Sequence, residues 1–417
     1  MKQEVELHER PSTITRGAIL AVIVAALGYF VDLFDIVLFS ILRIPSLKAL
    51  GITDPAELKS LGKHLLDLQL TGMLAGGIAF GMLGDKFGRL KTLFGSILVY
   101  SIANILNAFV TDVWQYEVLR FVAGFGLAGE LGAGITLVSE LLPTARRGLA
   151  TTLVAAVGLC GAVAAGIVAQ FFAWNHCYLI GGVLGLVLLV FRIGVSESGL
   201  FHAVRKQSTV SRGNPLQLLW PPQRMARFAC VVLGGMPIWF VGGVMFIFAP
   251  EIGVALGCPT AIMPAKVIMF AYSGVVVGDI ACGLLSQYLR SRRYAIIIFQ
   301  CMLAASIVLF INCAGASDER FYWLMSVIGA ATGFWAVIVT TAGEQFGTNL
   351  RATAATSAPN FIRATAVPVT WIWFWLSSMF DVASTTLWLG LACCVVGVIA
   401  VTCLKETFDR DLAYLEH

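Results

Sequence analysis

Long apolar runs recur along the whole chain, and they constrain the possible folds more than any other feature. About 20 apolar residues cross a hydrocarbon core ~30 Å thick as a helix. Runs of this length begin near Ala18, Leu65, Thr92, Gln115, Ala150, Cys177, Ala226, Ala265, Tyr294, Phe321, Pro359 and Ala383. Only 12% of the 417 residues are charged, against about 25% in a typical soluble domain. The sequence therefore predicts an all-α membrane protein with twelve transmembrane helices.

The lysines and arginines of the short loops predict the orientation of the chain. With the N-terminus inside, twenty of them fall in inside segments and seven, including Arg43 and Arg120, in outside segments. Because positively charged loops remain in the cytoplasm, we expect both termini to be cytoplasmic. The outside loops are short and contain no Asn-x-Ser/Thr sequon, which favours a multi-pass protein of a bacterial inner membrane.

The cysteines and nucleotide motifs give no indication of a cofactor. Ten cysteines lie mostly in apolar runs without a Cys-x-x-Cys pair, which argues against a disulfide framework and a metal site. No Walker sequence occurs, so ATP is not expected to drive the protein. The formal charge of +4 follows from the loop bias and does not indicate nucleic acid. We expect a monomer without enzymatic activity, whose partners are the lipid bilayer, a small-molecule substrate and protons.

Two parts of the chain repeat one another at an offset of about 202 to 206 residues. Gly81–Asp85 corresponds to Gly283–Gln287, and each segment precedes a basic cluster. Glu140 corresponds to Glu344, and each glutamate is followed by arginine. Repeats that occupy the same place relative to their helices indicate an internal duplication.

A polar and basic stretch separates the two repeats. It predicts an N-terminal six-helix bundle over 1–195, a cytoplasmic linker over 196–224, a C-terminal six-helix bundle over 225–404 and a cytoplasmic tail over 405–417. Parallel repeats of this kind place the solute site at their interface, near the membrane midplane.

A charged, glycine-containing loop with the sequence GMLGDKFGRLK occupies positions 81–91, between the second and third spans. Gly84 and Gly88 permit a tight turn and a close helix approach, while Asp85 and Arg89 place opposite charges at one membrane edge. The loop resembles the signature loop of the major facilitator superfamily. This resemblance implies a fold of two pseudo-symmetric six-helix bundles.

Within that superfamily, the chain is most similar to the metabolite:H+ symporter family. The first span has GYFVDLFD over 28–35 and the fourth has GELGA over 129–133, and both resemble patterns of that family. The fifth span has GLCGAVAAG over 158–166 without proline, and so lacks the Gly-Pro element of proton-coupled drug antiporters. The resemblance implies symport rather than export.

Three acidic residues, Asp32, Asp35 and Glu130, lie inside predicted spans. Each costs about 2.5–3.5 kcal/mol at the centre of a spanning helix, so these side chains must face protein or water. A carboxyl in such a site can load a proton on one side and release it on the other. We interpret all three as proton-coupling residues, and Asp35 also as a substrate contact. The alternative is a structural role, in which they bond to polar groups or an arginine and hold helices together.

Arg363 is the only basic residue placed well inside a predicted span, and it has no counterpart in the family pattern. A guanidinium there can bind a substrate carboxylate through two hydrogen bonds, which makes Arg363 the predicted substrate-binding residue. Two other interpretations remain open. Arg363 can neutralise an acid of the first half, or it can serve as a gate charge at the cytoplasmic end of its helix.

Charged residues and glycines at the cytoplasmic helix ends are predicted to form a gate between the halves. They are Gly84, Asp85, Gly88, Arg89, Glu140, Arg146, Arg147, Glu344 and Arg351. Pairs among the charged members would hold the inside closed and break when the cavity opens inward. The alternative is ordinary surface charge, where an ion pair contributes only about 0–1 kcal/mol.

These features predict a secondary active transporter that takes up a small organic acid or a zwitterionic metabolite together with protons, by alternating access. The alternative is a proton-coupled exporter of a metabolite, siderophore or drug.

Overall fold

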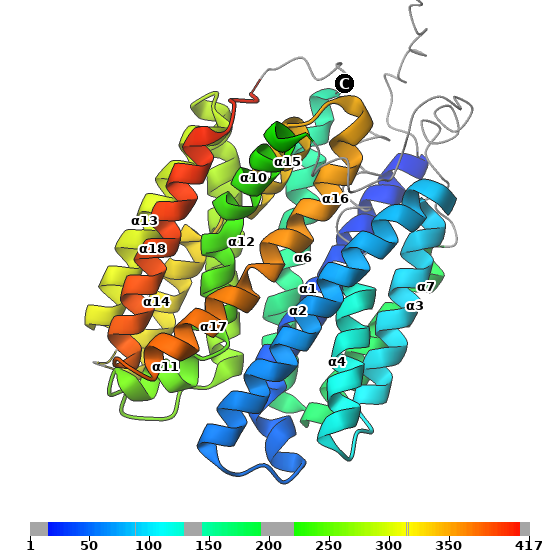
Figure 1. Cartoon of the computed structure of the whole chain (residues 1–417). Helices are drawn as coiled ribbons and strands as arrows, with labels where there is room; N and C mark the ends of the chain where they lie inside the picture. The colour runs from blue at the N-terminus through cyan, green and yellow to red at the C-terminus, as the bar shows by residue number, and fades with distance from the viewer. Residues whose placement is uncertain are drawn as a thin grey trace, which may run out of the picture.

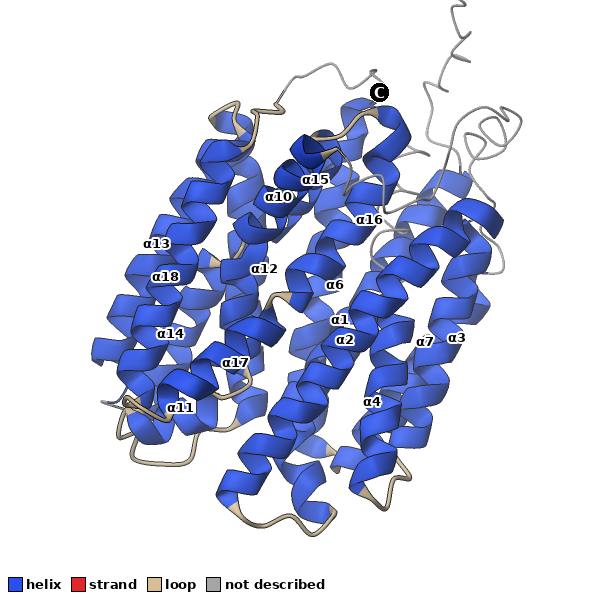
Figure 2. Cartoon of the chain, in the orientation of Figure 1, coloured by secondary structure: helices blue, strands red, loops and turns tan. Residues whose placement is uncertain are grey.

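The computed structural model describes residues 16–87, 89–128, 144–192, 221–313, 315 and 317–408. Within these residues the secondary structure is helical, and none of them lies in a strand (Figure 2). The helices run roughly parallel to one long direction (Figure 1). The predicted all-α fold of two six-helix bundles is confirmed. We call the end at which α1 begins and α18 ends the termini end, and the other the opposite end.

The first half contains six long helices among the described residues. They are α1 (Arg16–Ala49), α2 (Pro55–Phe87), α3 (Arg89–Asn107), α4 (Val113–Leu127), α6 (Thr144–Phe171) and α7 (Trp174–Arg192). Each helix ends after enough residues to cross a bilayer or most of one, since a helix rises 1.5 Å per residue.

The second half also builds six crossings from its described residues, but three of them are interrupted. They are α10 (Pro222–Phe240) with the π-helix η1 (Val241–Phe246) and the short α11 (Ala249–Ala255), α12 (Pro264–Tyr288), α13 (Arg292–Cys313), α14 (Asp318–Ala331) with α15 (Trp335–Glu344), α16 (Thr348–Ala364) with α17 (Ala366–Ser377), and α18 (Val382–Cys403). The boundaries predicted for the bundles, linker and tail stay predictions.

The outer surface of the helices is apolar, as a lipid environment requires. On α3, Leu98, Ile102 and Leu106 are each more than 40% exposed and lie four residues apart, so they form one outward stripe. Eight segments of the described chain are long and apolar enough to cross a membrane by length and composition.

Close glycine contacts repeat in the two halves. In α2, Gly72 and Gly76 lie against the backbone of Phe121 and Phe125 in α4, where an added Cβ would come within about 2.2 Å of a carbonyl oxygen. In α12, Gly274 and Gly278 approach the backbone of α14 in the same way. The offset between the two glycine pairs is the one found in the sequence repeat. Small residues that let helices approach closely therefore build the same helix pair twice.

A broken helix in the second half has a specific cause. Between α14 and α15, Gly333 lies directly against the backbone of Gly278 and Asp279. Asp279 then accepts a hydrogen bond from the Ala336 N–H at 2.9 Å, which satisfies an amide that the start of α15 leaves without a helical partner. This contact gives Asp279 a structural role.

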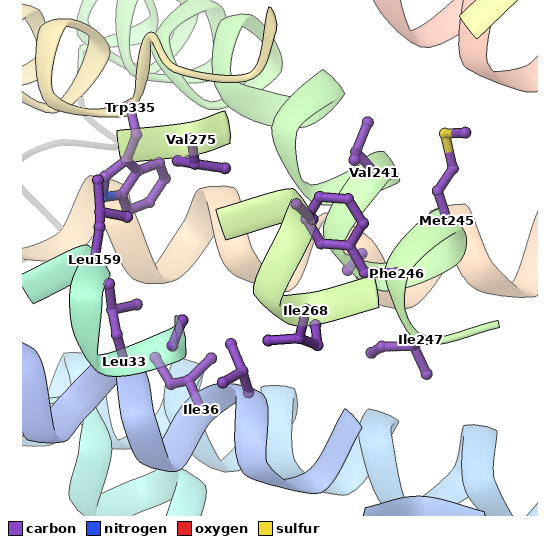
Figure 3. Close-up of a cluster of buried hydrophobic side chains, with 14 of the residues drawn as sticks. Leu33, Ile36, Leu159, Val241, Met245, Phe246, Ile247, Ile268, Val275 and Trp335 are labelled. Carbon is purple, nitrogen blue, oxygen red and sulfur yellow. The ribbon is translucent and has the colours of Figure 1, made fainter. Parts of the chain in front are cut away.

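The two halves meet across an apolar interface (Figure 3). Leu33 and Ile36 of α1 and Leu159 of α6 lie opposite Ile268 of α12 and Trp335 of α15, and all five are buried or nearly so. This packing places the centre of α1 at the interface, where it contacts helices of the second half. The polar residues of α1 are therefore surrounded by protein.

Candidate functional site

A buried ion pair joins the two halves near the middle of the fold. Arg363 of α16 donates from Nη2 to Asp32 Oδ2 of α1 at 3.5 Å, and the two side chains are 1% and 0% exposed. The residues are 331 positions apart in sequence. Of the three interpretations of Arg363, the structure favours a location inside the fold over one at the termini end, and it brings Arg363 together with Asp32.

Aromatic side chains surround this pair. The Arg363 guanidinium carbon lies 5.7 Å from the ring centre of Trp335 and 6.0 Å from that of Trp239. The two indoles meet edge to face at 6.5 Å. Tyr29 and Tyr272 both interact electrostatically with Arg363 and with Asp32. Sequence reasoning did not single out Trp239 or Trp335, because isolated tryptophans in apolar spans are common.

Several hydrogen-bond donors in this cluster have no hydrogen-bond partner among the described residues. They are Nε and Nη1 of Arg363 and Nε1 of Trp239. A buried donor without a partner costs about 1–3 kcal/mol, and more when it is charged. The arrangement can therefore bind an anion, because a carboxylate would satisfy the guanidinium through two parallel hydrogen bonds.

Asp35 lies one turn further along α1 and has different neighbours. Its carboxyl, 1% exposed, interacts with Arg120 of α4 and Asn104 of α3, and also with Asp32. Arg120 in turn donates to Asn104 Oδ1 at 3.0 Å. Asp35 is thus enclosed by its own half, whereas Asp32 contacts the other half.

The burial of Arg120 corrects the sequence analysis, which counted this residue in an outside segment. Because α4 begins at Val113, Arg120 lies two turns inside the helix and is 1% exposed. Its guanidinium carbon lies 4.7 Å from the Tyr178 ring centre. The hydroxyls of Tyr178 and Tyr116 are 2.5 Å apart, which continues the polar cluster toward the opposite end.

A second ion pair joins the halves at the opposite end. Arg43 of α1 donates to both carboxylate oxygens of Glu251 in α11, at 2.7 and 3.0 Å, and to the Ile247 carbonyl at 3.2 Å. The Arg43 side chain is 1% exposed and that of Glu251 is 23% exposed. The sequence analysis placed Arg43 in an outside segment. Its partner Glu251 could not be identified from the sequence, because it lies 208 positions away.

A further contact between the halves lies beside this pair. Asp67 of α2 accepts hydrogen bonds from Lys63 Nζ at 2.7 Å and from Trp371 Nε1 of α17 at 2.8 Å. The Lys63 ammonium also lies 4.4 Å from the Trp371 ring centre. Together with Arg43 and Glu251, these contacts join the two halves at the opposite end.

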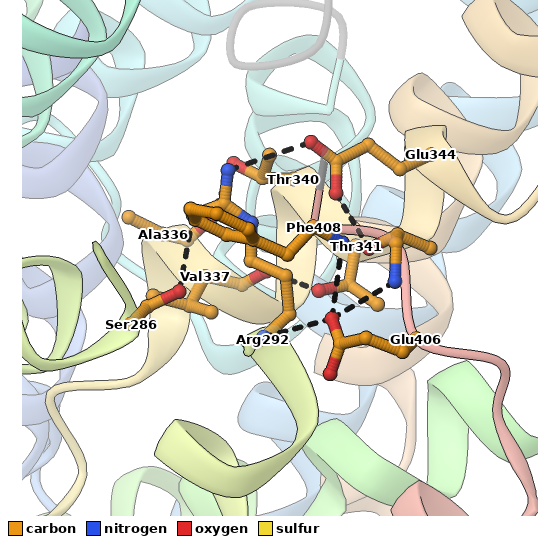
Figure 4. A network of polar contacts seen from close by, with 10 residues as sticks. Ser286, Arg292, Ala336, Val337, Thr340, Thr341, Glu344, Glu406 and Phe408 are labelled. Carbon is orange, nitrogen blue, oxygen red and sulfur yellow. Dashed lines mark hydrogen bonds and ion pairs between the residues drawn. The ribbon is translucent and has the colours of Figure 1, made fainter. Parts of the chain in front are cut away.

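At the termini end, the polar contacts around Glu344 lie within the second half (Figure 4). Glu344 pairs with Arg292 Nη2 at 3.5 Å and accepts a hydrogen bond from Thr407 Oγ1 at 2.6 Å. The segment after α18 adds Glu406, which accepts hydrogen bonds from Ser291 Oγ and from the Arg292 N–H. Burial would raise the pKa of Glu406, but the hydrogen bonds from Ser291 and from nearby backbone amides outweigh it, and the pKa lies below its ordinary value.

Most of the predicted gate falls where the structure gives no side-chain description. Glu130, Glu140 and Gly88 lie outside the described residues. The remaining gate positions other than Glu344 lie on described helices, with their side chains outside the description: Gly84, Asp85, Arg89, Arg146, Arg147 and Arg351. Their roles stay predictions. No group of three metal-ligating side chains occurs in the part of the chain that the structure describes.

Comparisons with known proteins agree on one family. The model of the Major Facilitator Superfamily matches residues 25–366. The chain is 25% identical over 347 residues to "Putative niacin/nicotinamide transporter NiaP" of Bacillus subtilis, covering 82% of this chain and 84% of that protein. It is 33% identical over 173 residues to "4-hydroxybenzoate transporter PcaK" of Pseudomonas putida, covering 39% and 38%. The crystal structure of a D-xylose-proton symporter superposes with a TM-score of 0.73 at 16% identity, covering 94% of this chain and 98% of that one.

Proposed function

This chain belongs to the major facilitator superfamily and is therefore a multi-pass membrane transporter, and we propose that it takes up a small organic acid by proton symport. The observation that carries the proposal is Arg363, a buried cation at the interface of the halves with two hydrogen-bonding nitrogens that have no partner among the described residues. Solute sites of parallel-repeat transporters lie at this interface.

The chemistry of Arg363 selects the class of substrate. A guanidinium recognises a carboxylate through two charge-assisted hydrogen bonds, which are about twice as strong as neutral ones. Trp239 and Trp335 beside it supply flat apolar surfaces that suit a ring. The named substrates of the two relatives, niacin or nicotinamide and 4-hydroxybenzoate, support a small aromatic acid as the first candidate.

Asp32 and Asp35 are the proposed proton-coupling residues, with Glu130 as a third that lies outside the described residues. Both aspartates are almost completely buried on α1, the helix that contacts both halves. One solved structure with a similar fold is named a D-xylose-proton symporter, which supports protons as the coupling ion.

The number of protons decides which part of the gradient is used. A proton moving inward across 100 mV supplies about 2.3 kcal/mol. A monoanion that enters with one proton moves no net charge, so only the pH gradient drives it. Two protons per monoanion, one on each aspartate, would also use the membrane potential.

We propose that the termini end faces the cytoplasm, as the loop charges predict. Arg43, Glu251 and the Asp67 contacts then close the outside, and the charged residues predicted at the termini end form the inside gate. Transport alternates between breaking one set of contacts and breaking the other. The bundle, linker and tail boundaries predicted from the sequence define the moving halves.

Uptake into proteoliposomes tests the proposal. We expect accumulation of nicotinate, benzoate or 4-hydroxybenzoate when the outside is acid, and no accumulation after a protonophore collapses the gradient. Arg363→Gln should abolish it. Accumulation that ignores the pH gradient contradicts symport, and accumulation of neutral sugars in preference to all three acids contradicts the substrate class.

A further inference from the structure

The contact between Asp32 and Arg363 has the features of an exchangeable one. We propose that the substrate carboxylate replaces Asp32 on Arg363, so that Asp32 takes up the proton when the substrate binds. This inference rests on the proposed function, because it assigns the order of events at the same site. It also separates the two aspartates, since Asp35 does not take part in the exchange.

The geometry of the pair is the first argument. Only one nitrogen of Arg363 reaches Asp32, at 3.5 Å, which is the limit of a hydrogen bond. Arg43 also reaches Glu251 through one nitrogen, Nη2, but it holds both carboxylate oxygens at 2.7 and 3.0 Å, so the contact between Arg363 and Asp32 is the longer of the two. Asp32 therefore neutralises the charge of Arg363 without occupying its fork, and Nε and Nη1 remain without a hydrogen-bond partner among the described residues.

The charge of the site is the second argument. Arg363 and an ionised Asp32 together are neutral, and a substrate carboxylate would add one negative charge to a fully buried cluster. An excess charge in a low-dielectric site is costly, and a buried acid then binds a proton instead. When Asp32 is protonated, the substrate carboxylate and Arg363 form the neutral pair, and the charge of the cluster is unchanged.

The other titratable groups near Asp32 do not replace it in this role. Tyr29 of α1 and Tyr272 of α12 are neutral phenols that interact with the pair. Asp279 of α12, which interacts with Tyr29, accepts the Ala336 N–H. Asp35 interacts with Asp32, but the arginine that it interacts with is Arg120 of the first half, and neither of its carboxylate oxygens has a hydrogen-bond partner among the described residues. Among the described residues, Asp32 is the acid that forms the ion pair with Arg363.

The exchange defines the form of substrate that can be coupled. A monocarboxylate brings one negative charge and displaces Asp32. Its carboxamide has the same shape but no charge, and it leaves the Asp32–Arg363 pair intact. Of a monocarboxylate and its carboxamide, the exchange therefore assigns proton-coupled transport to the monocarboxylate.

Binding of radiolabelled benzoate to the purified full-length protein between pH 5.5 and 8 tests the exchange. Benzoate is ionised throughout this range, so any pH dependence comes from the protein. We expect the Kd of the wild type to rise by about tenfold per pH unit where Asp32 is ionised, as linkage to one proton requires. Asp32→Asn should bind benzoate with a Kd that does not change with pH, because the competing charge is absent.

Asp35→Asn makes the same chemical change three residues away, at a predicted substrate contact. Whatever its effect on the absolute Kd, the slope of its Kd with pH should equal that of the wild type, because Asp35 is not the acid that Arg363 releases. Benzamide should compete weakly and equally at every pH. The melting temperature of each variant, measured in the same buffers, confirms that it is folded.

The outcomes separate the inference from the proposed function. A Kd that rises equally with pH in Asp32→Asn overturns the exchange and leaves carboxylate transport standing. If instead the Kd of Asp35→Asn does not change with pH, the exchange occurs at Asp35 and not at Asp32, and the inference is also overturned. If neither benzoate nor nicotinate binds to the wild type at any pH, both the exchange and the proposed substrate class are wrong.

Discussion

Asp32 and Asp35 lie three residues apart on one helix, yet their surroundings differ in the property that matters for transport. Asp32 pairs with Arg363 of the other half, whereas Asp35 interacts with Arg120 and Asn104 of its own half. When two halves move against each other, contacts within a half persist and contacts between halves change. An acid at the interface can therefore exchange its partner during the cycle, and an acid within one half keeps its partner.

The largest effect is expected from Arg363→Gln, which removes the cation of the interface. The loss of two charge-assisted hydrogen bonds to a carboxylate costs about 3–6 kcal/mol, so uptake should fall by at least about a hundredfold. Initial rates of radiolabelled benzoate uptake measure this. Arg227→Gln is a control for the loss of an arginine, because Arg227 donates to the Gln345 carbonyl away from the site. Equal losses in the two variants would contradict a specific role for Arg363.

Neutralising Asp35 is expected to separate proton coupling from substrate binding. Asp35→Asn should lower proton-driven accumulation by about tenfold or more, because each loss of about 1.4 kcal/mol of coupling free energy lowers accumulation by a factor of ten. Exchange of internal for external benzoate, which needs no net proton movement, should continue. Accumulation at the wild-type level would remove Asp35 from the coupling mechanism and make Asp32 sufficient.

The ion pair of the opposite end is expected to set which side of the protein is open. Arg43→Ala leaves Glu251 without its partner and should shift the population toward the state open at that end, by about tenfold for 1.4 kcal/mol. A cysteine placed at the buried Leu47, in a background without other cysteines, should then react faster with a maleimide. Arg43→Glu combined with Glu251→Arg should restore part of the protection. If the labelling rate does not change in Arg43→Ala, the pair does not close this end.

The smallest effect is expected at Glu406, far from the interface. Its pKa is lower in the folded protein than the ordinary value of 4.5, so its contribution to stability is present above pH 4.5 and is lost as the pH falls through the folded pKa. Glu406→Gln should lower the melting temperature at pH 7 and make little difference in more acid buffer. Lys405→Gln is the control, because the backbone carbonyl of Lys405 accepts a hydrogen bond from Gln345 Nε2 and the substitution keeps that carbonyl. A deficit that persists unchanged in acid would contradict the electrostatic explanation.

The fold was predictable because its main determinants are local. Apolar runs of spanning length and repeated glycines, such as Gly81 and Gly283, are visible in the sequence, the glycines at a constant offset. Asp32, Asp35 and Arg363 could be selected as candidates because a charge within an apolar run is costly. These arguments need no knowledge of which helices meet.

The partners of these charges could not be predicted, because they depend on contacts between distant helices. Arg43 and Arg120 lie near the ends of apolar runs, where a shift of a few residues decides between an exposed loop and a buried site. Glu251 lies on α11, a short helix that follows the π-helix η1, and no periodicity marked this break. The importance of Trp239 and Trp335 is visible only in the structure, where both lie beside Arg363.

The central claim is that carboxylate binding and proton binding at Asp32 are one event, and the number of protons taken up on binding tests it most directly. Benzoate is added to concentrated protein in weakly buffered detergent solution near neutral pH, and the pH change is recorded. The account predicts that the wild type and Asp35→Asn take up about one proton per benzoate bound, and that Asp32→Asn takes up none. Binding without proton uptake in the wild type, or with equal uptake in Asp32→Asn, would contradict the account.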